Sequence, residues 1–103
     1  METTMNSAVL IGNERYGLYI GYVSATDAEI VATKHVRVAR CRHVCRWFGR
    51  SGGITSLAAF GPCGPRVEES LVGAECDALL TGVVAVYELT EEAIAAFASI
   101  VPT

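Results

Sequence analysis

The stretch CRWFGRSGGITSLAAFGP, residues 45–62, contains the change from strand to helix that decides the class of fold. Its first part is aromatic and basic, which is typical of a strand. Two adjacent glycines then predict a bend. Residues 51–60 place Ile54, Leu57 and Ala58 at helical spacing, and the Gly-Pro pair at positions 61–62 predicts where that helix ends.

The residues before this stretch predict strands. Residues 8–12 form a short apolar run, and YGLYIGYVS, residues 16–24, is rich in aromatic and β-branched residues. Gly17 and Gly21 indicate a bend or a bulge in a curled sheet. After a polar turn, a third strand is expected over residues 28–31.

The segment from residue 35 to residue 47 has no clean apolar face as a single flat strand. Arginine alternates with valine along it, so one face would mix charged and apolar side chains. A kink near residues 39–42 resolves the conflict, because Val36 and Val38 are then buried before the kink and Val44 after it.

The downstream part predicts a short edge strand at residues 71–75, a long strand at 78–87 bent at Gly82, and a helix at 90–100 capped by Thr90. The expected order is therefore β-β-β-β-α-β-α. This order predicts an α+β fold, a small curled antiparallel sheet or partial β-barrel with two helices.

Composition adds expectations about assembly and location. The 103 residues suffice for a single domain, 1–103. The hydrophobic share of 51% is high for so small a chain, which predicts apolar surface covered in a homo-oligomer. No run approaches the roughly 18 apolar residues of a membrane span. The polar start predicts no signal peptide, so a cytoplasmic protein with reduced cysteines is expected.

Charge is distributed unevenly along the chain. The net charge is −3, which disfavours a general nucleic-acid binder. Six of the eight basic residues nevertheless lie between positions 34 and 50, and no acidic residue occurs between Glu29 and Glu68. This basic block predicts either a local anion site or ion pairs with acidic residues further along, at positions 68, 69, 75 and 77.

The anion hypothesis centres on the start of the expected helix. If Ser51 caps that helix, the following amides have no helical partner, and two glycines let a ligand approach the backbone. Adjacent arginines add charge, and a tryptophan can stack on a base. The predicted ligand is a phosphorylated, nucleotide-like small molecule. The candidate binding residues are Arg46, Trp47, Arg50, Ser51, Gly52 and Gly53, with Arg40, Arg42 and His43 around them.

The alternative interpretation is a glycine turn whose amides are satisfied internally, with Trp47 in the core. The cysteines and histidines lack the paired spacing of a zinc site, so neither a metal nor another cofactor is expected. A thiol–imidazole pair of His43 with Cys63 is conceivable in space but has no support in the spacing. No carboxylate near His35 or His43 in sequence could orient them, so no enzyme activity is expected.

Several motifs together resemble a family of small proteins encoded by tailed phages and prophages. They are the glycine-bearing strand pair YGLYIGYVSATDAEIVA, the basic-aromatic strand CRHVCRWFG, the helix start GGITSLA and the terminal VVAVYELTEEA. The resemblance implies a phage product in a bacterial cytoplasm. Such proteins include sponges that sequester nucleotide second messengers, and this anti-defence role is the expected function. The alternative is a module that docks on an acidic host or virion protein.

Overall fold

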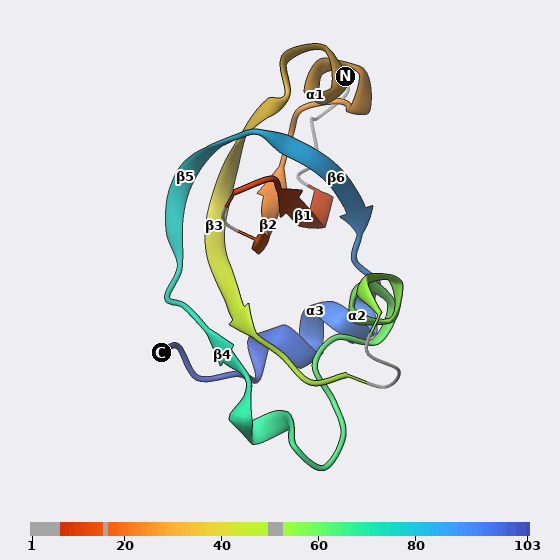
Figure 1. The fold of residues 1–103 in the computed structure, drawn as a ribbon, viewed down its shortest axis with the longest axis vertical. Coiled ribbons are helices and arrows are strands. Elements are labelled where there is room, and N and C mark those ends of the chain that lie inside the picture. The colour runs from red at the N-terminus through yellow and green to blue at the C-terminus, as the bar shows by residue number, and fades with distance from the viewer. Residues whose placement is uncertain (1–6, 16, 50–52) are drawn as a thin grey trace, which may run out of the picture.

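Six antiparallel strands form a curled sheet in the computed structural model, which describes residues 7–15, 17–49 and 53–103 (Figure 1). The strands are β1 (Ser7–Asn13), β2 (Gly17–Val23), β3 (His35–Arg46), β4 (Leu71–Val72), β5 (Cys76–Thr81) and β6 (Val83–Glu88). The helices are α1 (Asp27–Thr33), α2 (Ile54–Phe60), α3 (Glu91–Ala98) and the short 3-10 helix η1 (Val67–Glu69). The predicted α+β class is confirmed.

The sheet is curled but not closed. Its order is β4-β3-β2-β1-β6, and β5 pairs with the first half of β3. Figure 1 shows β5 continuing into β6 as one arch over the sheet. Gly82 permits this corner, because its φ of 68° lies in the left-handed region that favours glycine. The single strand expected at 78–87 is therefore two strands that belong to opposite parts of the sheet.

The predicted kink in the basic segment is a bulge within one strand. Arg40 has a φ of 54°, and the register of β3 against β2 shifts between Ile20 and Tyr22. Such a bulge reverses which face the later side chains occupy. Gly21 lies opposite the bulge, where an added Cβ would overlap Cγ1 of Val38, so the close approach of the two strands requires glycine.

The prediction of a strand at residues 28–31 is wrong, since this segment belongs to α1. Thr26 and Glu29 form a capping box: the Thr26 hydroxyl accepts from the Glu29 N–H at 3.2 Å, and the Thr26 N–H donates to the Glu29 carboxylate at 2.8 Å. Lys34, with a φ of 59°, ends the helix. The fold therefore has three α-helices among the described residues instead of the two expected.

The other boundaries differ less. The helix expected at 51–60 begins at Ile54, and its N-cap is Gly53, with no side-chain cap. Ser51, the predicted cap, lies outside the described residues. The edge strand is shorter than expected, and Thr90 caps α3 as predicted, accepting from the Ala93 N–H at 3.1 Å.

Two apolar clusters lie on the two faces of the sheet. Side chains alternate along a strand, so β1 contributes Val9 and Ile11 to one cluster and Leu10 to the other. Helix α1 covers the first cluster through Ile30, while α2 and α3 cover the second, where Phe97 is 2% exposed. The helices and the curled sheet thus enclose a core on both faces of β1.

Candidate functional site

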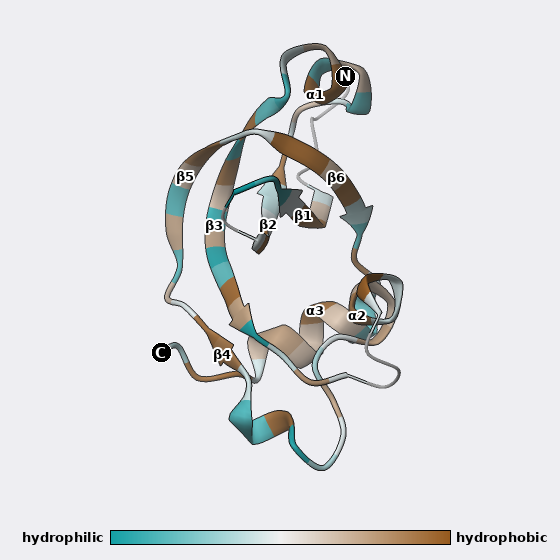
Figure 2. Ribbon diagram, in the orientation of Figure 1, coloured by the Kyte–Doolittle hydropathy of each residue, from teal (hydrophilic) through white to brown (hydrophobic). Residues whose placement is uncertain are grey.

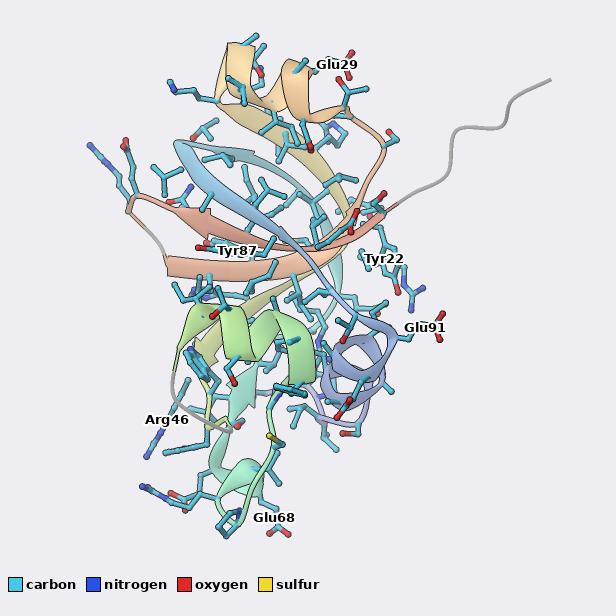
Figure 3. All side chains as sticks on the ribbon, turned by 90° about the vertical axis from the view of Figure 1, so that its right-hand side faces the viewer. Tyr22, Glu29, Arg46, Glu68, Tyr87 and Glu91 are labelled. Carbon is cyan, nitrogen blue, oxygen red and sulfur yellow. The ribbon has the colours of Figure 1, made fainter. Side chains whose placement is uncertain are left out.

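Two arginines lie against one aromatic ring at the end of β3. The guanidinium carbon of Arg66 is 4.2 Å from the centre of the Phe48 ring, and that of Arg46 is 5.5 Å from it. The backbone fixes this ring, because the Phe48 N–H donates to the Ser70 hydroxyl at 3.3 Å and its carbonyl accepts from the Cys63 N–H at 2.9 Å. Figure 3 shows Arg46 pointing outward near the end of the molecule opposite Glu29.

Glu69 holds the two guanidinium groups beside the ring. Nε and Nη2 of Arg66 donate to its carboxylate at 2.9 and 2.8 Å, whereas Arg46 approaches it only to 3.8 Å. The hydrogen bonds from Arg66 lower the pKa of Glu69, which its small burial opposes, and they raise the pKa of Arg66. We call Arg46, Phe48, Arg66 and Glu69 the arginine–phenylalanine cluster.

The cluster has an excess of positive charge at the surface. It contains two guanidinium groups and one carboxylate, and the three charged side chains are roughly half exposed, at 53%, 58% and 47%. A guanidinium stacked on a ring keeps its in-plane N–H groups available to an anion. The 3.8 Å contact of Arg46 exceeds hydrogen-bond length, so an incoming anion competes there with a weak partner.

Of the residues predicted for the site, Arg46 belongs to the cluster, and Trp47 lies between Arg46 and Phe48 in the chain. Trp47 is half-buried and packs against the apolar cluster under α2 and α3, as the alternative interpretation predicted. Gly53 is exposed, and a Cβ added to it would contact nothing within 4 Å among the described residues. Arg50, Ser51 and Gly52 lie outside the described residues.

Arg42 instead has a structural role. It is 6% exposed, and its guanidinium donates to four backbone carbonyls, those of Gly73 at 2.7 Å, Ile100 at 2.8 Å, Phe97 at 2.9 Å and Val72 at 3.4 Å. Burial lowers its pKa, and the negative charge of Glu75 opposes that shift. Arg42 therefore joins β3 to the segment after β4 and to the C-terminal end of α3, where a cation is favourable.

Arg40 confirms, for its own position, the prediction that the basic block pairs with acidic residues of the same chain. Its Nη2 lies 3.1 Å from the Glu75 carboxylate, and its backbone N–H donates to Asp77 at 3.2 Å. The guanidinium also lies 5.3 Å from the centre of the Tyr22 ring. Because its side chain is exposed, the ion pair adds little stability.

His43 is held between neighbours on β2 and β3. Its ring stacks on Tyr19, with 4.6 Å between ring centres, and its Nδ1 lies 3.3 Å from Sγ of Cys45. The thiol partner is thus Cys45 and not Cys63. The residues expected to share one site consequently divide among a structural arginine, a surface ion pair, a stacked histidine and the arginine–phenylalanine cluster.

The sequence interpretation did not include Phe48, Arg66 or Glu69 among the ligand-binding residues. The i,i+3 spacing of Arg66 and Glu69 is a recognisable signal for an ion pair on a helical turn. Nothing in the linear sequence indicates that this turn folds back against Phe48. The contact depends on the loop after α2. This loop returns to the end of β3, where the Cys63 N–H donates to the Phe48 carbonyl.

The comparisons with known proteins place the chain in a family. The family model described as Domain of unknown function (DUF6948) matches residues 6–97, so the chain belongs to this family. No curated protein and no solved structure matches it. Within the described ranges, no helix is long and apolar enough to cross a membrane, and no three potential ligand side chains gather into a metal site.

Proposed function

We propose that this member of the family binds a phosphorylated, nucleotide-like small molecule at the arginine–phenylalanine cluster and holds it without converting it. The observation that carries the proposal is the position of two guanidinium groups, 4.2 and 5.5 Å from the centre of a single phenylalanine ring. Arginine is the side chain best suited to phosphate, because its planar fork donates two parallel hydrogen bonds to phosphate oxygens.

The local charges support this ligand class. The chain carries a net charge of −3, so a diffusing anion is attracted only where positive charge is concentrated. Arg46 and Arg66 provide such a concentration, and Glu69 neutralises only part of it. The phosphate replaces the 3.8 Å contact of Arg46 with shorter, charge-assisted hydrogen bonds.

Binding without conversion follows from the chemistry of the same side chains. Hydrolysis of a phosphate ester needs a general base or a metal-activated water near the phosphorus. The one carboxylate of the cluster is already hydrogen-bonded to Arg66, and its pKa is lowered, which makes it a weak base. The cluster is therefore suited to bind an anion, and its one carboxylate is a poor general base.

The biological role we propose is that of a phage-encoded accessory protein in the bacterial cytoplasm. There it acts as an anti-defence sponge that sequesters a nucleotide second messenger. The resemblance to small phage and prophage proteins supports this role, as does the small size of the chain. A sponge needs affinity and abundance, and both are compatible with one compact, non-catalytic domain.

Isothermal titration calorimetry with a panel of cyclic nucleotides, cyclic dinucleotides and cyclic ADP-ribose tests the proposal. We expect one ligand to bind, and Arg46→Gln and Arg66→Gln each to weaken it about 10- to 100-fold, the loss expected for charge-assisted hydrogen bonds. Arg50→Glu is expected to abolish binding. Arg37→Gln is the matched control, since Arg37 is an exposed β3 arginine outside the cluster.

Two results would overturn the assignment. One is a ligand whose affinity is unchanged in both cluster variants. The other is the absence of binding by any panel member, combined with retention of an acidic polypeptide in a pull-down from infected cells. That second result would favour the protein-docking alternative instead.

A further inference from the structure

A groove runs between α1 and the outer edge of β6. It consists of two adjoining hollows of about 660 and 340 Å³, which share Asp27, Ile30 and Val86 in their walls. Helix α1 runs antiparallel to β6 along it. The Lys34 carbonyl at the end of the helix accepts from the Val83 N–H at 3.0 Å, and Asp27 at its start shares a hollow with Val86 and Glu88. The groove is therefore as long as β6 itself.

The edge of β6 that faces this groove has unpaired backbone groups. Within the described part of the chain, β6 pairs with β1 alone. The Leu89 N–H donates to the Ala8 carbonyl. Because hydrogen-bonded and non-hydrogen-bonded pairs alternate along an antiparallel ladder, the N–H and C=O groups of Val86 and Glu88 point away from β1. Such an edge is a template for another strand.

Apolar side chains flank the unpaired edge. Val84 on β6 is 65% exposed, and Val31 on α1 is 71% exposed, although both belong to the most apolar residue class. Figure 2 shows the first part of β6 as a hydrophobic segment. Exposed valines beside an open edge are characteristic of an interaction surface.

We propose that this groove is the interface of a homodimer, in which β6 pairs antiparallel with β6 of a second copy. A pairing centred on Val86 uses the outward N–H and C=O groups of that residue in both copies, and it sets Glu88 opposite Val84 of the partner copy. The two sheets then form one continuous sheet, and Val31 of each α1 lies on the same face near the two-fold axis.

The arrangement of charges along the groove favours a second copy over an unrelated strand. Lys34 lies at the Val83 end, whereas Glu88 and Asp27 line the other end. A two-fold axis reverses the direction of the second groove, so Lys34 of each copy meets the acidic end of the other. Glu14 also lines the Lys34 end and partly offsets that charge. The opposite charges that meet therefore belong to the same surface in two copies of the protein.

This interface is independent of the proposed ligand site. Figure 3 shows α1, marked by Glu29, at the opposite end of the molecule from Arg46. A dimer through β6 therefore leaves both arginine–phenylalanine clusters accessible. Failure of the ligand proposal would leave the dimer proposal standing, and the reverse also holds.

Sedimentation equilibrium over a range of concentrations tests the interface. We expect a dimer, and we expect Val84→Glu to weaken it at least about tenfold, because the new carboxylate lies opposite Glu88 of the partner copy at both ends of the paired strands. Leu79→Glu is the matched control, since Leu79 is 51% exposed on β5 and does not line the groove. Circular dichroism establishes that each variant is folded.

Charge-reversal variants distinguish this interface from other possible contacts between two copies. Lys34→Glu and Glu88→Lys should each weaken the dimer, and the double variant should recover most of the loss, because it restores opposite charges across the two-fold axis. A wild-type protein that stays monomeric at millimolar concentration overturns the proposal. So does an oligomer whose stability is the same in Val84→Glu and Leu79→Glu.

Discussion

Replacement of Arg42 by methionine tests whether this buried arginine is structural. Methionine retains much of the side-chain length and none of the donors. The guanidinium makes three hydrogen bonds of 2.7–2.9 Å and a longer one of 3.4 Å, all to backbone carbonyls. At about 1–1.5 kcal/mol for each short bond, its removal costs about 3–5 kcal/mol, because the carbonyls stay buried without a donor.

Urea unfolding followed by circular dichroism measures this loss as a change in the midpoint at constant slope. Arg42→Lys should recover only part of the stability, because an ammonium group cannot reach four carbonyls in the geometry of a planar fork. Arg37→Met is the control, an identical substitution at an exposed position of the same strand, with an expected change within about 0.5 kcal/mol. An Arg42→Met variant destabilised by less than about 1 kcal/mol would refute the structural role.

Three further predictions concern β3 and its neighbours. Gly21→Ala should destabilise the fold by about 1–3 kcal/mol in urea, because the new Cβ meets Val38 where the strands approach closely; Gly53→Ala, with no neighbour within 4 Å, should cost far less. Burial raises the pKa of Cys41 from 9.0 to about 11, so the thiol of the unfolded chain ionises at a lower pH than that of the folded chain. The free energy of unfolding therefore keeps this contribution below pH 9 and loses it as the pH rises towards 11. The loss is at most about 2.7 kcal/mol, and Cys41→Ala should remove it from the pH profile of unfolding. Cys41 and Cys76 lie opposite each other in the register, so a low-molecular-weight disulfide should oxidise them to a cross-link; peptide mapping that finds both thiols free while others have reacted would contradict this pairing.

The sheet could be predicted where the local pattern and the tertiary environment agree. The segments of β1, β2 and β6 are apolar and β-branched, and they form strands. Helix α1 was missed because Ile30 and Val31 indicate a strand in a window of only seven residues. The deciding signal was the capping box of Thr26 and Glu29, which satisfies backbone groups at the helix start and outweighs weak local propensity.

The candidate site was only partly predictable for a different reason. Arg40, Arg42 and Arg46 carry the same charge and lie on one segment, so the sequence alone assigned all three to one binding site. The bulge at Arg40 changes the face on which the later side chains lie. Arg42 is then buried against the end of α3, whereas Arg46, at the last position of β3, is exposed. Arg66 completes the cluster from a loop that is distant in sequence, and its contact with Phe48 is set by tertiary structure.

The measurement that tests the central claim most directly is native mass spectrometry of the purified protein with and without the nucleotide panel. It reports the number of subunits and the mass of any bound molecule in one spectrum. We predict an intact phosphorylated ligand bound to the wild-type protein and recovered with unchanged mass after denaturation, and no such complex with Arg46→Gln. A ligand recovered as a cleaved product, or one bound equally by Arg46→Gln, would contradict the account.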